Sequence, residues 1–112
     1  LNFLTEEKLL KIKQMTLEFH FPHSQRHWEV LNKINKTHYL IHYHANNNNH
    51  LLYSIDGRSI PAVFECTYIR KDIAPAGLEY NTEPLPTPLD TSNRKNKLDF
   101  YINCKPWVFP KT

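Results

Sequence analysis

The stretch that decides the fold runs from Met15 to Ala45 and reads MTLEFHFPHSQRHWEVLNKINKTHYLIHYHA. Hydrophobic and polar residues alternate over Met15–Phe21 and again over Thr37–Ala45, and this period of two predicts two β-strands. Between them, apolar residues recur at helical spacing, which predicts a helix over Ser24–Asn35. The stretch therefore predicts a strand-helix-strand unit of an α/β protein.

The flanking sequence predicts one more helix and further strands. Thr5–Gln14 reads as a short helix with a threonine cap and two acidic residues in its first turn. His50–Ile55 predicts a short edge strand, which the turn signal Asp56-Gly57 closes. Ala62–Arg70 predicts the third main strand. No helix separates it from Thr37–Ala45, so we expect these two strands to be antiparallel neighbours.

After residue 70 the sequence predicts an extended tail. Six of the eight prolines lie between Pro75 and Pro110, and proline cannot donate to a strand ladder. Within the tail, Leu98–Ile102 reads as a last short strand, and we expect Trp107 and Phe109 to anchor the tail on the body. The chain is thus expected to form one domain with an N-terminal helix (1–14), a core of sheet and helix (15–70) and a Pro-rich tail (71–112).

Composition excludes several classes of protein. With 40% hydrophobic and 22% charged residues, the 112-residue chain can build a core. No run approaches 18 apolar residues, so we expect no membrane insertion. The net charge of +3 is small and its basic residues are dispersed, so no nucleic-acid partner is expected. Cys66 and Cys104 alone make no disulfide framework, which favours an intracellular, reducing compartment.

Seven histidines stand in the first half of the chain, and several share strand faces with carboxylates. At a period of two, Glu18 shares a face with His20, and Glu65 shares a face with Thr67. Within Thr37–Ala45, the same period predicts that two sets of residues lie on opposite faces of the strand. The first set is His38, Leu40, His42 and His44, and the second is Tyr39, Ile41 and Tyr43.

Two interpretations of these polar residues are open. In the first, they are satisfied polar groups, with Glu18 and Glu65 holding histidines by hydrogen bonds. In the second, they line a pocket that acts as an acid/base site, because a histidine beside a carboxylate can act near neutral pH. In that pocket His42, His44 and Glu65 could also bind a divalent metal, although a His-x-His pair is weak evidence for one.

Three ordered segments resemble a known family. They are Glu18-Phe19-His20, then YLIHYHANN over Tyr39–Asn47, then IPAVFECTYI over Ile60–Ile69. They are similar to the C-terminal part of FkbM-like methyltransferases, whose members read E-F-H, H-x-H-x-N-N and I-P-x-V-x-E-x-T-Y in this order. In the tail, Leu85-Pro86, Leu89-Asp90, Asn93 and Leu98-Asp99 continue the resemblance.

The resemblance implies the C-terminal half of a class I, Rossmann-like methyltransferase sheet. Met15–Phe21 would be its fifth strand, Ser24–Asn35 the following helix, and the last two strands the antiparallel pair that closes such sheets. It also implies methyl transfer from S-adenosylmethionine to an oxygen of a sugar or another small metabolite. The implied catalytic residues are Glu18, His20, His42, His44 and Glu65, and the implied substrate-binding residues are Asn46, Asn47 and Thr67.

The sequence departs from the family where the cofactor would bind. Such folds hold the cofactor on a Gly-rich turn after the first strand and on an acidic residue after the second. This sequence has two glycines, Gly57 and Gly77, and neither of these features. We therefore expect cofactor binding only with the missing half of the fold or another protein chain. The alternative is a non-catalytic structural or assembly subunit that keeps the half-sheet.

Overall fold

The computed structural model describes residues 4–20, 25–47, 52–55, 58–90, 92–93, 95, 100–103, 105 and 107–110. They form a small mixed α/β domain around a three-stranded antiparallel sheet. In chain order the elements are α1 (Glu6–Leu9), β1 (Gln14–His20), α2 (Gln25–Ile34), β2 (His38–Ala45), β3 (Leu52–Ile55), β4 (Arg58–Pro61), β5 (Val63–Arg70) and the 3-10 helix η1 (Lys71–Ile73).

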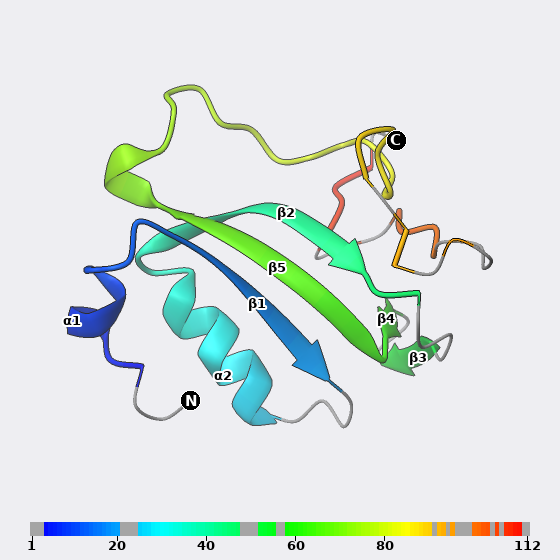
Figure 1. Cartoon of the computed structure of the whole chain (residues 1–112), viewed down its shortest axis with the longest axis horizontal. Coiled ribbons are helices and arrows are strands. Elements are labelled where there is room, and N and C mark those ends of the chain that lie inside the picture. Colours follow the sequence, from blue (N-terminus) through cyan, green and yellow to red (C-terminus); the bar gives the residue numbers. More distant parts are fainter. Residues whose placement is uncertain are drawn as a thin grey trace.

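The main sheet has the order β1-β5-β2, with β5 antiparallel to both neighbours (Figure 1). The predicted strand-helix-strand unit and the antiparallel pairing of β2 with β5 are confirmed. Since both outer strands oppose β5, β1 and β2 run parallel to each other, and α2 is the crossover that parallel strands require. β5, the last strand among the described residues, therefore lies between the two strands of this unit.

Two segments differ from their predicted extents. The helix expected over residues 5–14 is only the single turn of α1, because the main chain turns into β1, where Gln14 pairs with Ile69. The expected edge strand ends at Ile55 as predicted, but it pairs with β4 in a separate two-stranded sheet. Asp56-Gly57 lies outside the described residues. Pro61 ends β4, and Ala62 follows before β5 begins.

A β-bulge divides β2. Leu40 pairs with Tyr68 and His42 pairs with the next residue of β5, Thr67, so Ile41 is the extra residue. His38 and Leu40 therefore face α2, whereas His42 and His44 face the opposite side of the sheet. The prediction that these four residues share one face was wrong, because strict alternation assumes a strand without a bulge.

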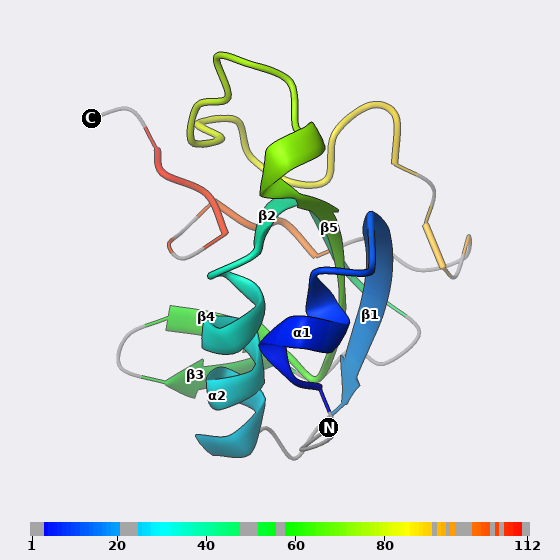
Figure 2. The ribbon, with the colours of Figure 1, turned by 90° about the vertical axis from the view of Figure 1, so that its left-hand side faces the viewer.

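The core lies between α2 and the sheet, and the tail closes its far side. Figure 2 shows α1 and α2 side by side, and Leu9 and Ile34 from these two helices are completely buried. Trp107 stacks on Tyr43 at 3.9 Å between ring centroids, so its predicted role as an anchor is confirmed. Phe109 packs on Tyr80 of the tail itself.

A single bridge fixes the middle of the tail. Leu85 and Ile102 exchange two backbone hydrogen bonds and are both buried in the core. Among the described residues this is the whole of the strand pairing near the predicted strand 98–102, whose first two residues lie outside the described part. The tail is thus held by an isolated bridge, by side-chain packing and by hydrogen bonds to the sheet, such as those of Asp90 and Asn93.

Candidate functional site

The strand register brings the predicted polar residues onto one face of the main sheet. Glu18 of β1 pairs with Glu65 of β5, and Glu65 also pairs with His44 of β2. The adjacent row consists of Thr16, Thr67 and His42. This polar face, made of these six residues, lies opposite the face that packs on α2. Residues 47 positions apart in the sequence, Glu18 and Glu65, are therefore direct neighbours.

Donor groups surround the two facing carboxylates. Like charges placed directly across a strand pair destabilise a sheet. Around Glu18, His20 Nε2 lies 2.9 Å from Oε2, and Asn46 Nδ2 donates to Oε1 at 3.2 Å. Asn93 of the tail donates to Glu65 Oε1 at 3.4 Å. These contacts agree with the interpretation in which polar groups satisfy one another, and they bring His20 and Asn46 to the polar face.

His42 is paired with a tail residue that the sequence analysis did not select as a site residue. His42 Nε2 lies 2.6 Å from Asp90 Oδ1, and Asp90 Oδ2 accepts from the backbone N–H of Thr87 at 2.7 Å. Burial raises the pKa of Asp90, but the hydrogen bonds from Thr87 and the charge of His42 outweigh it, so its pKa lies below the ordinary value. The only sequence signal for Asp90 was its place in the Leu89-Asp90 pair of the resemblance.

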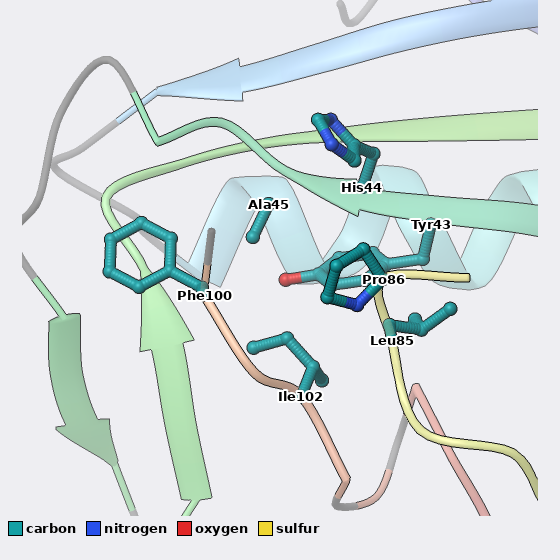
Figure 3. A pocket seen from close by; sticks show the side chains of 7 residues that line it. All are labelled: Tyr43, His44, Ala45, Leu85, Pro86, Phe100 and Ile102. Atoms are coloured by element: carbon teal, nitrogen blue, oxygen red, sulfur yellow. The ribbon is translucent and has the colours of Figure 1, made fainter. Parts of the chain in front are cut away.

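His44 and Asn47 have different surroundings. The Nε2 atom of His44 is buried and has no hydrogen-bond partner among the described residues. Figure 3 shows its ring on the other side of β2 from Tyr43, at a small depression that Leu85, Pro86 and Ile102 also line. Asn47 is almost fully buried and donates to Ser92 Oγ at 2.6 Å. Asn47 therefore joins the end of β2 to the tail.

Three further points concern Thr67, the Cys66 thiol and the predicted metal site. Thr67 and Thr16 share a hydrogen bond of 3.2 Å between their hydroxyls. Burial raises the pKa of the Cys66 thiol to about 12, against a smaller opposing effect of its hydrogen bond with Tyr68, and this free cysteine lies in the core. Within the described part of the chain, no three His, Cys, Asp or Glu side chains are arranged to hold one metal ion.

A groove of about 1110 Å³ borders the polar face where His42 stands. Its walls are α2, the outer edge of β2 and two segments of the tail. Exposed or half-buried rings line it, and His42 and Thr87 lie at its lining too. These rings are Trp28, Tyr39, Tyr80 and Phe109. The groove is somewhat larger than typical small-molecule sites, which measure about 300–1,000 Å³.

The comparisons with known proteins give no relative for this arrangement. No family model, no curated protein and no solved structure matches the chain. Among the helices of the described residues, none has the length and apolarity that crossing a membrane requires.

Proposed function

We propose that this chain is the acceptor-side half of an FkbM-like, S-adenosylmethionine-dependent O-methyltransferase. The observation that carries the proposal is the row of Glu18, Glu65 and His44, which comes from three separate motifs of the resemblance and meets on one sheet face. Carboxylates and imidazoles side by side are the groups that accept a proton from a hydroxyl near neutral pH.

The strand order supports the same proposal. The resemblance implies a strand, a helix and a final antiparallel pair, and the chain has β1, α2 and the pair of β2 with β5. Among the described residues, β1 pairs with β5 alone, so its other edge has no strand. An uncovered edge is a template for further pairing, and we infer that the remaining strands of the fold join there.

The described residues do not form the Gly-rich turn on which such folds hold the adenosyl part of the cofactor. The described glycine, Gly77, lies in the tail with φ of 78°, away from any turn between a strand and a helix. We therefore assign cofactor binding to another segment or chain. The roles left here are proton acceptance by His20, His42, His44, Glu18 or Glu65, and acceptor binding by Asn46, Asn47 and Thr67.

The test uses the native protein isolated from its source. Its intact mass and any co-purified chains are determined first, and methyl transfer from labelled S-adenosylmethionine to a panel of hydroxylated metabolites is then measured. We expect transfer, and we expect His44→Ala to abolish it. His27→Gln is the matched control, because His27 lies on α2 against Phe19, away from the polar face. Unchanged turnover in His44→Ala would refute the catalytic role of this row.

A second candidate is a non-catalytic assembly subunit. The free edge of β1, together with the missing Gly-rich turn, favours it. In this case the native protein has a mass near 13.3 kDa, transfers no methyl group and co-purifies with a partner whose strand covers β1. A chain that stays monomeric and folded without a partner contradicts this candidate.

A further inference from the structure

We propose that Asp90 is a positioning residue that fixes the tautomer of His42, so that His42 Nδ1 takes the proton of the bound hydroxyl. The role of His42 as a base rests on the function proposed above. The pairing of Asp90 with His42 does not, since it follows from the geometry of this chain alone.

The contact geometry determines which imidazole nitrogen carries the proton. An ionised carboxylate only accepts hydrogen bonds, so the 2.6 Å contact with Asp90 Oδ1 requires a hydrogen on His42 Nε2. A neutral imidazole has one N–H, and its lone pair is then on Nδ1. Among the described residues, the side-chain hydrogen bond of His42 is made at Nε2, with Asp90. His42 is therefore held at one nitrogen, and its basic nitrogen is left for a ligand.

Asp90 is itself held in place. Its second oxygen accepts from Thr87 N at 2.7 Å and from Thr87 Oγ1 at 3.2 Å. The side chain of Asp90 is 10% exposed, whereas that of His42 is 39% exposed. The carboxylate is therefore largely buried, while the imidazole is partly exposed and belongs to a residue that lines the groove. This is the arrangement in which a buried acid orients a histidine base.

The other charged groups near His42 are few. Its cross-strand neighbour on β5 is Thr67, which is uncharged. The nearest titratable residues on the strands are His44 on β2 and Glu65 on β5, one row along. Glu79 and Lys71 line the groove from the tail and η1. Among the described residues, Asp90 is the carboxylate that hydrogen-bonds to His42.

The proton step balances within these groups. The O–H bond of the acceptor breaks, its proton forms a new N–H bond at Nδ1, and its electron pair stays on the oxygen, which becomes the nucleophile. His42 becomes an imidazolium, and the negative charge of Asp90 stabilises it. When the product leaves, the imidazolium returns its proton to water.

The tautomer is measured directly by NMR of the ¹⁵N-labelled 112-residue chain, at a pH where His42 is neutral. We expect the wild type to carry its proton on Nε2. In Asp90→Asn, the two Thr87 donors hold the amide oxygen, so the amide N–H₂ faces His42 and moves the proton to Nδ1. Asp72→Asn is the control, because Asp72 pairs with Arg70 on the surface, and it should leave the tautomer unchanged.

The same variants are then assayed as the native methyltransferase. We expect Asp90→Asn to lower kcat at least ~100-fold, with a smaller change in KM, and Asp90→Glu to restore part of it. An Nδ1–H tautomer in the wild type overturns the proposal, and this result does not depend on whether any variant folds. A tautomer that moves while kcat is unchanged overturns the base role. If His42 carries its proton on Nε2 but the native protein transfers no methyl group, the proposed function is overturned, while the pairing of Asp90 with His42 is supported.

Discussion

At the scale of single residues, the sequence predicted the site residues that lie on strands, but not their partners in the tail. The period of two correctly placed Glu18, Glu65 and His44 on strands, and the register then aligned them. Asp90 lies 48 positions after His42 in a Pro-rich segment without a period, so no pattern could bring the two together. Contacts made by irregular chain depend on tertiary packing, which periodicity does not describe.

The ionised Asp90 predicts a pH-dependent stability. Its folded-state pKa lies below the ordinary value of 3.8, so its contribution is complete above that value and is lost as the pH falls through the folded pKa. We expect Asp90→Asn to lower the unfolding free energy at pH 7 by about 1.5–3 kcal/mol, and by less at pH 3, where this position in the unfolded chain is mostly protonated. Urea unfolding at both pH values measures this.

Asp72→Asn serves as the control for this prediction, since its exposed pair with Arg70 should contribute less at pH 7. An equal loss at pH 7 and pH 3 in Asp90→Asn would show that the carboxylate charge is not involved.

At the scale of elements, the sequence located β2 to within one residue, but it placed the side chains of the first half of the strand on the same face as His42 and His44. The bulge at Ile41 turns His38 into the core, where it is 1% exposed. There its Nδ1 lies 2.7 Å from Thr37 Oγ1, and its Nε2 lies 2.8 Å from the carbonyl oxygen of Ile12. His38 therefore joins the turn before β1 to the start of β2, and its role is structural.

His38→Phe tests this role. Phenylalanine fills a similar volume but leaves the Ile12 carbonyl and the Thr37 hydroxyl without this partner. We expect the unfolding free energy to fall by about 1–3 kcal/mol, since the Ile12 carbonyl loses this partner while the Thr37 hydroxyl keeps its hydrogen bond to the Ile34 carbonyl. Urea unfolding of His38→Phe is compared with that of His20→Phe, whose imidazole is 64% exposed. Equal stability of the two variants would refute the structural role of His38.

At the scale of the whole molecule, the hydrophobic patterns and the position of the prolines predicted the division into a core and a tail. The anchor at Trp107 was also predictable, because a large aromatic residue in a polar, Pro-rich segment is rarely left in water. The order β1-β5-β2 was not, since alternation alone does not say between which strands a later strand inserts. The separate β3–β4 sheet escaped prediction for the same reason.

Trp107→Ala tests whether the anchor holds the tail. The ring is 8% exposed and stacks on Tyr43, so we expect a loss of about 3–5 kcal/mol in urea unfolding. Amide hydrogen exchange should become faster at Leu85 and Ile102, whose bridge lies in the same core. Tyr101→Ala, at a residue 71% exposed, should change neither measurement. Unchanged exchange at the bridge in Trp107→Ala would mean that the tail does not depend on this ring.

The extra residue at position 41 also divides β2 into two parts that should tolerate substitutions differently. Before it, the side chains at even positions, such as His38, face the interior, so their volume is constrained. The odd position, Tyr39, is exposed and should accept more substitutions. After it the parity reverses: Tyr43 and Ala45 are buried in the core, and His42 and His44 lie on the polar face. If every residue of this eight-residue strand were substituted, the sensitive positions should be the even-numbered ones before Ile41 and the odd-numbered ones after it.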